Sequence, residues 1–81
     1  MSFMDELRPR LITCFTAVFS GLTPDEAPHV TIDTLAAWDS SHHFILMQVI
    51  EEEFGIRLPE EVLGEIDSFR GFEDYLSAKA A

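Results

Sequence analysis

Apolar residues recur at intervals of three and four along most of this chain, and this spacing limits the possible folds more than any other feature. The first series comprises Phe3, Leu7, Leu11, Phe15, Val18 and Phe19. Such spacing places side chains on one face of an α-helix, and no segment alternates convincingly enough to predict a strand. We therefore predict an all-α fold. With 81 residues, the chain is expected to form one domain over residues 1–81.

The first predicted helix runs from about Ser2 to Phe19. Ser2 is a candidate N-cap, and Gly21 is a typical stop signal. Pro9 conflicts with an uninterrupted helix because an interior proline removes a hydrogen bond. The helix is therefore expected either to begin near Arg8 or to bend there.

A long connection follows over residues 21–37, where Thr23, Pro24, Asp25 and Pro28 interrupt regular structure. We expect three apolar residues to pack this segment onto the core, and Trp38 to pack its end against the bundle. The three residues are Val30, Ile32 and Leu35.

The second predicted helix begins at Asp39 or Ser40 and ends at Phe54, with Asp39 as N-cap and Gly55 as the C-terminal glycine. Its expected core positions are Leu46, Ile50 and Phe54, with Met47 and Phe44 beside them.

Two further helices are predicted in the last quarter of the chain. Pro59 suits the start of a short third helix, and Ser68 is a candidate N-cap for a final one. Their apolar residues are Val62, Leu63 and Ile66, and then Phe69, Phe72, Tyr75 and Leu76. The predicted architecture is a bundle of three main helices and one short helix.

The net charge of −10 excludes some classes of partner. Nucleic acids and anionic membranes are bound through clustered Lys and Arg, which this chain lacks. A basic patch on another protein is the natural complement, although the charge could also serve solubility alone. Cys14 is the single cysteine, so no internal disulfide is expected, and we interpret it as a core residue. No signal peptide or membrane-length apolar run is visible, and we expect a cytoplasmic protein without membrane insertion.

Ser40 is the strongest candidate for a modified residue. It falls in the first turn of the second helix, where free N–H groups and the helix dipole favour a phosphate. The simpler alternative is that Ser40 or Ser41 only caps the helix.

The wider pattern resembles the acyl carrier protein family. The resemblance is carried by Asp39-Ser40, by Glu51-Glu52-Glu53-Phe54, and by Leu58-Pro59-Glu60-Glu61. It continues through Ile66-Asp67-Ser68-Phe69 and Tyr75-Leu76, and it is strongest between Leu35 and Leu76.

This resemblance implies a four-helix, acyl-carrier-like bundle with a long loop between its first two helices. It implies that Ser40 receives 4′-phosphopantetheine from coenzyme A through a phosphopantetheinyl transferase, with Asp39 beside the attachment site. It also implies a non-catalytic, monomeric shuttle that presents thioesters to acyl-transfer or synthase enzymes with basic docking patches. The expected partner-binding residues on the second helix are Ser41, Ile45, Glu51, Glu52 and Glu53.

The chain departs from the family pattern close to the modified serine. Ser41 stands where leucine is usual, and His42 and Ile45 replace frequent acids. We therefore expect a specialised carrier in a dedicated pathway, with fatty acyl, polyketide and aminoacyl cargoes all open. The alternative is an unmodified acidic interaction module with the same fold.

The remaining candidates point to no second chemistry. His42 and His43 are adjacent and face different directions, and together with His29 they match no familiar zinc spacing. We interpret them as surface residues. A nucleophile–base–acid set is also not apparent, so an enzyme is not expected.

Overall fold

Three α-helices form most of the structure, a computed structural model that describes residues 3–80 apart from the side chains of residues 3–5, 60, 63 and 80. They are α1 (Phe3–Val18), α2 (Ser40–Phe54) and α4 (Phe69–Ala80). Two short elements join them, the 3₁₀-helix η1 (Ala27–His29) and the single-turn α3 (Glu60–Leu63). Within the described residues there is no strand, only an isolated bridge between Thr31 and Ser68. The prediction of an all-α protein is therefore confirmed.

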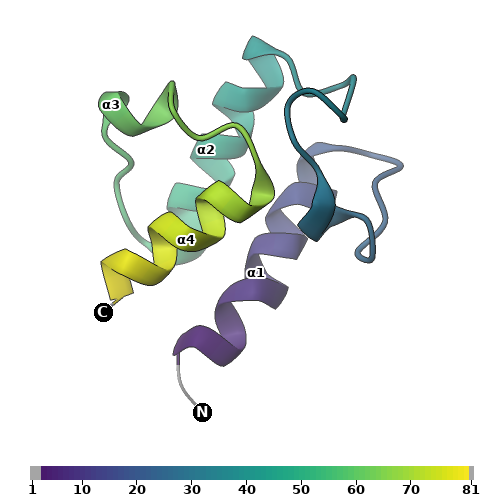
Figure 1. The fold of residues 1–81 in the computed structure, drawn as a ribbon. Coiled ribbons are helices and arrows are strands. Elements are labelled where there is room, and N and C mark those ends of the chain that lie inside the picture. The colour runs from purple at the N-terminus through teal and green to yellow at the C-terminus, as the bar shows by residue number, and fades with distance from the viewer. Residues whose placement is uncertain (1–2, 81) are drawn as a thin grey trace.

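Helix α1 lies against both α2 and α4, and η1 lies against α1 and α4 (Figure 1). The start of α1 and the end of α4 lie on the same side of the molecule, and α3 stands out at the edge (Figure 1). None of the described helices combines the length and apolarity that would be needed to cross a bilayer.

Helix α1 contains Pro9 and begins before it, at Phe3, so the alternative of a start near Arg8 is wrong. Leu7 and Leu11, on either side of Pro9, are both buried. Burying large aliphatic side chains stabilises by roughly 1.5–3 kcal/mol each, which offsets the hydrogen bond that proline removes. The predicted N-cap Ser2 lies outside the described residues.

The connection between α1 and α2 is held by local hydrogen bonds. Thr23 and Glu26 form a reciprocal pair, in which each backbone N–H donates to the other side chain at 3.1 and 3.2 Å. This is the capping-box arrangement that typically starts a helical turn, and η1 follows it directly. Thr31 and Thr34 form a similar pair, at 2.8 and 3.2 Å. The segment is therefore a series of tight turns.

The same connection is attached to the start of α4. The Ile32 N–H donates to the Asp67 carbonyl at 2.8 Å, and the Phe69 N–H donates to the Val30 carbonyl at 3.1 Å. Val30 is buried and Leu35 packs against the core, as predicted. Ile32 was expected to pack there too, but it is 39% exposed. The prediction for Ile32 is therefore wrong.

Both ends of α2 follow the sequence prediction. The Asp39 side chain accepts a hydrogen bond from the His42 N–H, and Gly55 adopts a left-handed conformation with φ of 64°. The Ile56 N–H then reaches back to the Glu51 carbonyl at 3.2 Å, which completes a Schellman motif. Leu46, Met47 and Ile50 are buried. Phe44, which was predicted beside them, is instead 59% exposed, because its position falls beyond the side of α2 that the neighbouring elements cover.

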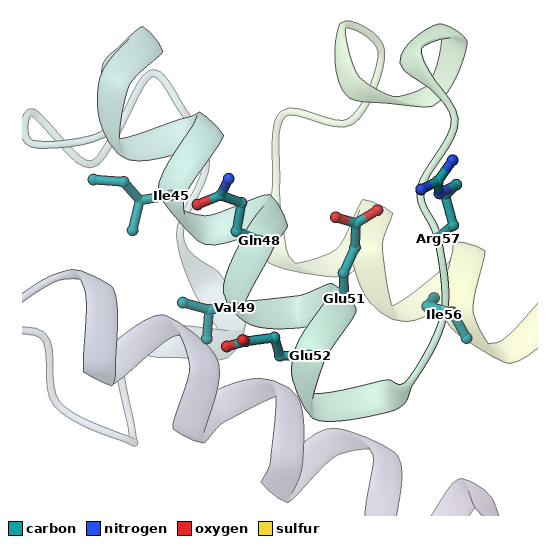
Figure 2. A pocket seen from close by; sticks show the side chains of 7 residues that line it. All are labelled: Ile45, Gln48, Val49, Glu51, Glu52, Ile56 and Arg57. Carbon is teal, nitrogen blue, oxygen red and sulfur yellow. The ribbon is translucent and has the colours of Figure 1, made fainter.

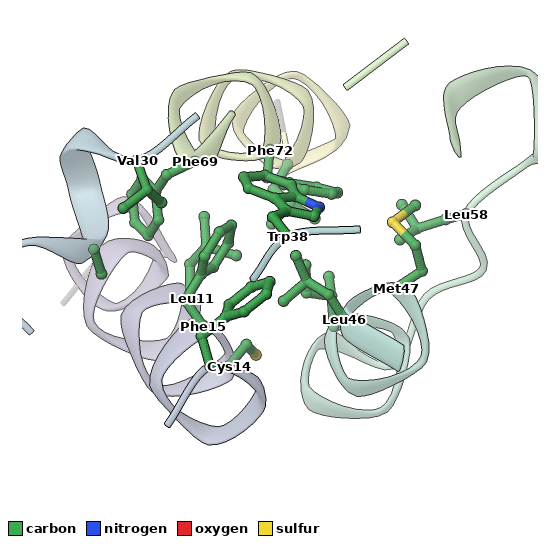
Figure 3. Close-up of a cluster of buried hydrophobic side chains, with 14 of the residues drawn as sticks. Leu11, Cys14, Phe15, Val30, Trp38, Leu46, Met47, Leu58, Phe69 and Phe72 are labelled. Carbon is green, nitrogen blue, oxygen red and sulfur yellow. The ribbon is translucent and has the colours of Figure 1, made fainter. Parts of the chain in front are cut away.

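The core is a single cluster centred on aromatic rings (Figure 3). Phe15 lies 5.0 Å from Phe69 and 5.9 Å from Phe72, measured between ring centroids. Cys14 is buried beside them, as predicted, and burial raises the pKa of its thiol to about 11. Ser68 caps α4 as predicted, since its hydroxyl accepts from the Gly71 N–H at 3.0 Å.

Candidate functional site

Trp38 fixes the chain immediately before the candidate site. It is only 3% exposed, and its ring meets Phe15 edge-on at 5.5 Å and stacks on Phe72 at 6.3 Å (Figure 3). A tryptophan buries roughly 150–250 Å², which corresponds to about 4–6 kcal/mol of gross transfer free energy. The end of the long connection is thereby anchored, and Asp39 and Ser40 must follow at the surface.

Ser40 is the first residue of α2, and its side chain is exposed. The Asp39 cap occupies the N–H of His42. The N–H groups of Ser40 and Ser41, at the first two helical positions, have no acceptor within the helix by geometry. Ser40 therefore combines a reachable hydroxyl with the positive end of a helix dipole.

Asp39 carries a stable negative charge beside Ser40. Its Oδ1 accepts from the His42 backbone N–H at 2.9 Å and from the ring Nδ1–H of His42 at 2.8 Å. The backbone hydrogen bond from His42, followed by the side-chain bond, lowers the pKa of the Asp39 carboxyl. The His42 ring also stacks on Phe19 at 5.7 Å. Asp39 is thus a helix cap whose carboxylate already accepts hydrogen bonds from the backbone and the ring of His42.

His43 has a structural partner that the sequence did not suggest. The indole Nε1–H of Trp38 donates to His43 Nδ1 at 2.9 Å, and the two rings stack at 5.9 Å. A nitrogen that accepts a hydrogen bond carries no proton, so this bond places the His43 proton on Nε2. Both histidines are partly exposed, as the interpretation of surface residues expects, but each ring has a hydrogen-bond partner that the sequence did not suggest.

A small cavity of about 240 Å³ opens next to Ser40. It lies between the start of α2, the connection that precedes it, and the turn before α4. Its lining residues are Ile32, Ser40, His43, Gly64, Ile66 and Asp67. The exposed position of Ile32 is explained by this arrangement, since its side chain forms one wall. Ser40 therefore borders a mostly apolar recess, whereas Ser41 does not.

The acidic run at the end of α2 has separate roles for its three carboxylates. Glu51 Oε2 accepts from the backbone N–H of Leu58 at 2.6 Å. Glu53 accepts from Arg10 Nε at 2.8 Å, and its carbonyl accepts from the Arg10 guanidinium as well. Glu52 makes no ion pair or hydrogen bond with any side chain or backbone group that the structure describes. Two of the three predicted partner-binding acids therefore already have intramolecular partners.

A shallow groove of about 540 Å³ lies between α2 and the segment after it (Figure 2). Its lining residues are Ile45, Gln48, Val49, Glu51, Glu52, Ile56 and Arg57. In Figure 2, Ile45, Gln48 and Glu52 project from α2, and Arg57 projects from the following segment. The predicted residues Ile45 and Glu52 thus share one open surface, which Ser41 continues towards the start of the helix.

Within the described residues there is no group of three or more His, Cys, Asp or Glu side chains arranged to hold a metal ion. Comparisons with the models of known protein families, with curated proteins and with solved structures each found no match to this chain. The function is therefore inferred from the chain's own residues and geometry.

Proposed function

We propose that this protein is an acyl carrier protein that holds acyl groups as thioesters on a 4′-phosphopantetheine arm attached to Ser40. The observation that carries the proposal is the position of Ser40, which is exposed at the first residue of a well-capped helix. The sequence pattern that surrounds it, from Asp39 to the segment after α2, supports the same assignment.

The residues around Ser40 fit a phosphate-linked arm. A phosphodiester on the Ser40 oxygen would face the free N–H groups of the first helical turn. The recess lined by Ile32 and Ile66 is open beside that oxygen, so an arm could lie along it or extend into solvent. When bound, the arm supplies a terminal thiol that forms thioesters.

Attachment of the arm requires a separate enzyme. The Ser40 oxygen would form a bond to the β-phosphorus of coenzyme A, the pyrophosphate linkage would break, and adenosine 3′,5′-bisphosphate would leave. The displaced serine proton needs a base. Within the carrier, the Nδ1 atom of His42 is bonded to Asp39 and the Nδ1 atom of His43 accepts from Trp38, so structural contacts hold both rings in place. We assign the base to the phosphopantetheinyl transferase, in keeping with a carrier that has no catalysis of its own.

The carrier role also agrees with the charge. With a net charge of −10, the protein should be drawn to enzymes with basic surroundings at the active site. Carrier–enzyme encounters must be brief, and a monomer with a small docking surface suits them. The cytoplasm, where coenzyme A and reducing conditions coexist, suits a chain with one buried thiol.

The test is intact-mass measurement after incubation with coenzyme A and a broad-specificity phosphopantetheinyl transferase. Wild-type protein should gain the mass of one phosphopantetheine group. Ser40→Ala should gain none, and the matched variant Ser41→Ala should gain it as wild type does. Absence of a gain in wild type, or a gain that survives Ser40→Ala, would defeat the assignment.

A second candidate is an unmodified acidic interaction module with a carrier-like fold. The exposed side chains of Phe44 and Ile45 favour it, because an apolar surface can bind a partner without an arm. The mass of the protein purified from its native host separates the two functions. An unmodified mass in growing cells would favour the interaction module.

A further inference from the structure

Two adjacent histidines at the start of α2 make hydrogen bonds of opposite character. The Nδ1 atom of His42 is bonded to the carboxylate of Asp39 at 2.8 Å, and the Nδ1 atom of His43 accepts from the indole N–H of Trp38 at 2.9 Å. An imidazolium ion carries a proton on both nitrogens, so it can donate to a carboxylate but cannot accept from a donor. Protonation therefore keeps the His42 contact and breaks the His43 contact.

We propose that the Trp38–His43 hydrogen bond is a pH-sensitive latch on the residues that lead into α2. Neutral His43 holds the latch closed. A proton taken up from solvent at Nδ1 of His43 opens it, because the indole N–H of Trp38 then loses its acceptor. The latch goes beyond the proposed function, since it needs no arm on Ser40 and works in the unmodified chain.

The indole N–H of Trp38 depends on this acceptor. Trp38 is only 3% exposed, so water has little access to the N–H group when the bond to His43 is lost. The ring of Phe72 lies 6.3 Å from both Trp38 and His43, measured between centroids, and carries no polar atom. Stacking of a charged imidazole on the indole offsets part of the loss, but it leaves a buried donor without an acceptor. Protonation of His43 therefore removes a contact that the fold does not replace.

Two carboxylates attract a proton to His43, and the bond from the indole opposes it. Asp67, from the turn before α4, lines the same recess as His43. Asp39 caps the helix four residues earlier, and a hydrogen bond from the backbone of His42 lowers the pKa of its carboxyl, so it stays ionised in mild acid. The ring of Phe72 from α4, and the aromatic rings of α1 behind the indole, carry no charge. Because histidine is the side chain that changes charge at roughly pH 5–8, mild acid is the condition that should open the latch.

The recess beside Ser40 gives the charged ring a position to move into. Its volume is about 240 Å³, and His43 and Asp67 both line it. A protonated ring is attracted to the carboxylate of Asp67 and repelled by the positive end of the indole N–H dipole. Neutralising Asp67 should therefore make the latch harder to open.

Trp38 connects the latch to the start of α2. Its backbone N–H donates to the Leu35 carbonyl at 2.9 Å, and its buried ring anchors the long connection two residues before Ser40. With the latch closed, the Asp39 cap and Ser40 follow from a fixed point. With the latch open, residues 35–43 should unfold locally more often, since one buried contact fewer holds them. Only the consequence for an arm on Ser40, which would then be presented less rigidly, rests on the proposed function.

Nuclear magnetic resonance on the unmodified protein tests the latch directly, because Trp38 is the single tryptophan and gives one indole N–H signal. As the pH falls from about 7.5 to about 5.5, the indole proton should shift upfield because its hydrogen bond is lost. Its exchange with solvent, corrected for the intrinsic effect of pH, should accelerate by roughly tenfold. Both changes should have the midpoint that is measured on the ring carbons of His43.

Matched variants assign the effect to one imidazole. His43→Asn places an amide oxygen close to the position of Nδ1, where it accepts from the indole but does not titrate. The indole signal of this variant should therefore not depend on pH in the same range. His42→Asn leaves the latch intact and should keep the wild-type response. Asp67→Asn should move the midpoint of opening to lower pH, because the imidazolium loses an attractive charge.

Thermal unfolding measures the same bond independently. Between about pH 7.5 and about pH 5.5, the Tm of wild type should fall by about 4–8 °C more than that of His43→Asn, the shift expected for one hydrogen bond in a domain of this size. The sign follows from linkage, since the unfolded chain takes up the proton without losing a hydrogen bond. Other groups that titrate in this range are common to both proteins and cancel in the difference.

The outcomes decide the latch without reference to the arm. An indole signal that stays constant while the His43 ring titrates overturns it, and so does a His43 ring that stays neutral down to about pH 5. A pH response that persists in His43→Asn, or that disappears in His42→Asn, overturns it as well. If His43→Asn does not fold, the comparison of the two midpoints within wild type decides alone. Because no coenzyme A or transferase is used, failure of the latch and failure of Ser40 modification are separate results.

Discussion

Glu51 offers the sharpest test of how the acidic end of α2 is organised, because its neighbour Glu52 is a nearly perfect control. Both are glutamates on the last turns of the same helix, and both oppose the helix dipole. They differ in one contact: Glu51 Oε2 accepts the Leu58 N–H at 2.6 Å, and Leu58 is only 5% exposed. We predict that Glu51→Ala destabilises the fold and that Glu52→Ala does not.

The magnitude follows from that contact. A hydrogen bond to a charged acceptor contributes roughly 1.5–3 kcal/mol, and losing it leaves a buried N–H without an acceptor. Removing a negative charge near a helix C-terminus raises the free energy of unfolding by about 0.3–1 kcal/mol. The net cost of Glu51→Ala is therefore about 1–2.5 kcal/mol, while Glu52→Ala is neutral or slightly stabilising. For a domain of this size the difference in Tm is roughly 5–15 °C.

Urea and thermal unfolding, followed by far-UV circular dichroism and Trp38 fluorescence, measure this difference directly. Glu51→Gln is an intermediate case because the amide oxygen still accepts the Leu58 N–H without the charge. It should lie between wild type and Glu51→Ala. Equal stability of Glu51→Ala and Glu52→Ala would refute the structural role of Glu51. It would also restore Glu51 to the set of acids available to a partner.

Three further predictions concern groups whose partners are equally specific. In a double-mutant cycle, His43→Leu should lower the free energy of unfolding by about 1–3 kcal/mol when Trp38 is present, because the buried indole N–H loses its acceptor. In a Trp38→Phe background the same substitution should cost clearly less. Additive effects of the two substitutions would contradict the Trp38–His43 hydrogen bond. The hydrogen bond from Arg8 lowers the pKa of the Glu73 carboxyl in the folded protein. The ionised carboxyl therefore contributes its full stabilisation at a pH above 4.5, the ordinary pKa of a glutamate. This contribution is lost as the pH falls through the lower pKa of the folded state. Glu73→Gln should therefore weaken the fall in the free energy of unfolding at acidic pH. An unchanged dependence on pH would count against the Arg8–Glu73 ion pair. The Cys14 thiol is buried, and its pKa is raised to about 11. At pH 8 it should react with a disulfide reagent no faster than the protein unfolds. Rapid labelling of the native protein would refute the buried position of this thiol.

The ends of α2 show how far local chemistry predicts structure. Asp39 as N-cap and Gly55 as the left-handed C-terminal residue are both readable from the sequence, because each acts on its own few neighbours. The Ser68 cap is of the same kind. A local signal was also missed: Thr23 and Glu26 have the spacing of a capping box, yet the segment was interpreted only as a break in regular structure.

The site depends on contacts between residues far apart in the chain. Burial of Phe44 was wrongly expected because an apolar residue in a helix of high apolar content has no unique face until neighbouring helices are placed. The same reason applies to Ile32, whose exposure depends on how the long connection is placed against the start of α4. The bonds of Glu51 and Glu53 join α2 to a later segment and to α1, and no spacing rule within α2 reveals them.

The amino-acid sequence alone is enough to predict the all-α class, both ends of α2, the acidity and the candidate hydroxyl at the start of that helix. These features depend on periodicity, capping and composition, which act over a few residues. Packing of the helices sets which apolar side chains face solvent and which acids remain available to a partner, and it places Ser40 at the border of a recess. Those properties arise when α1, α2 and α4 pack around Trp38 and Phe15, since burial and pairing across the chain are set by that packing.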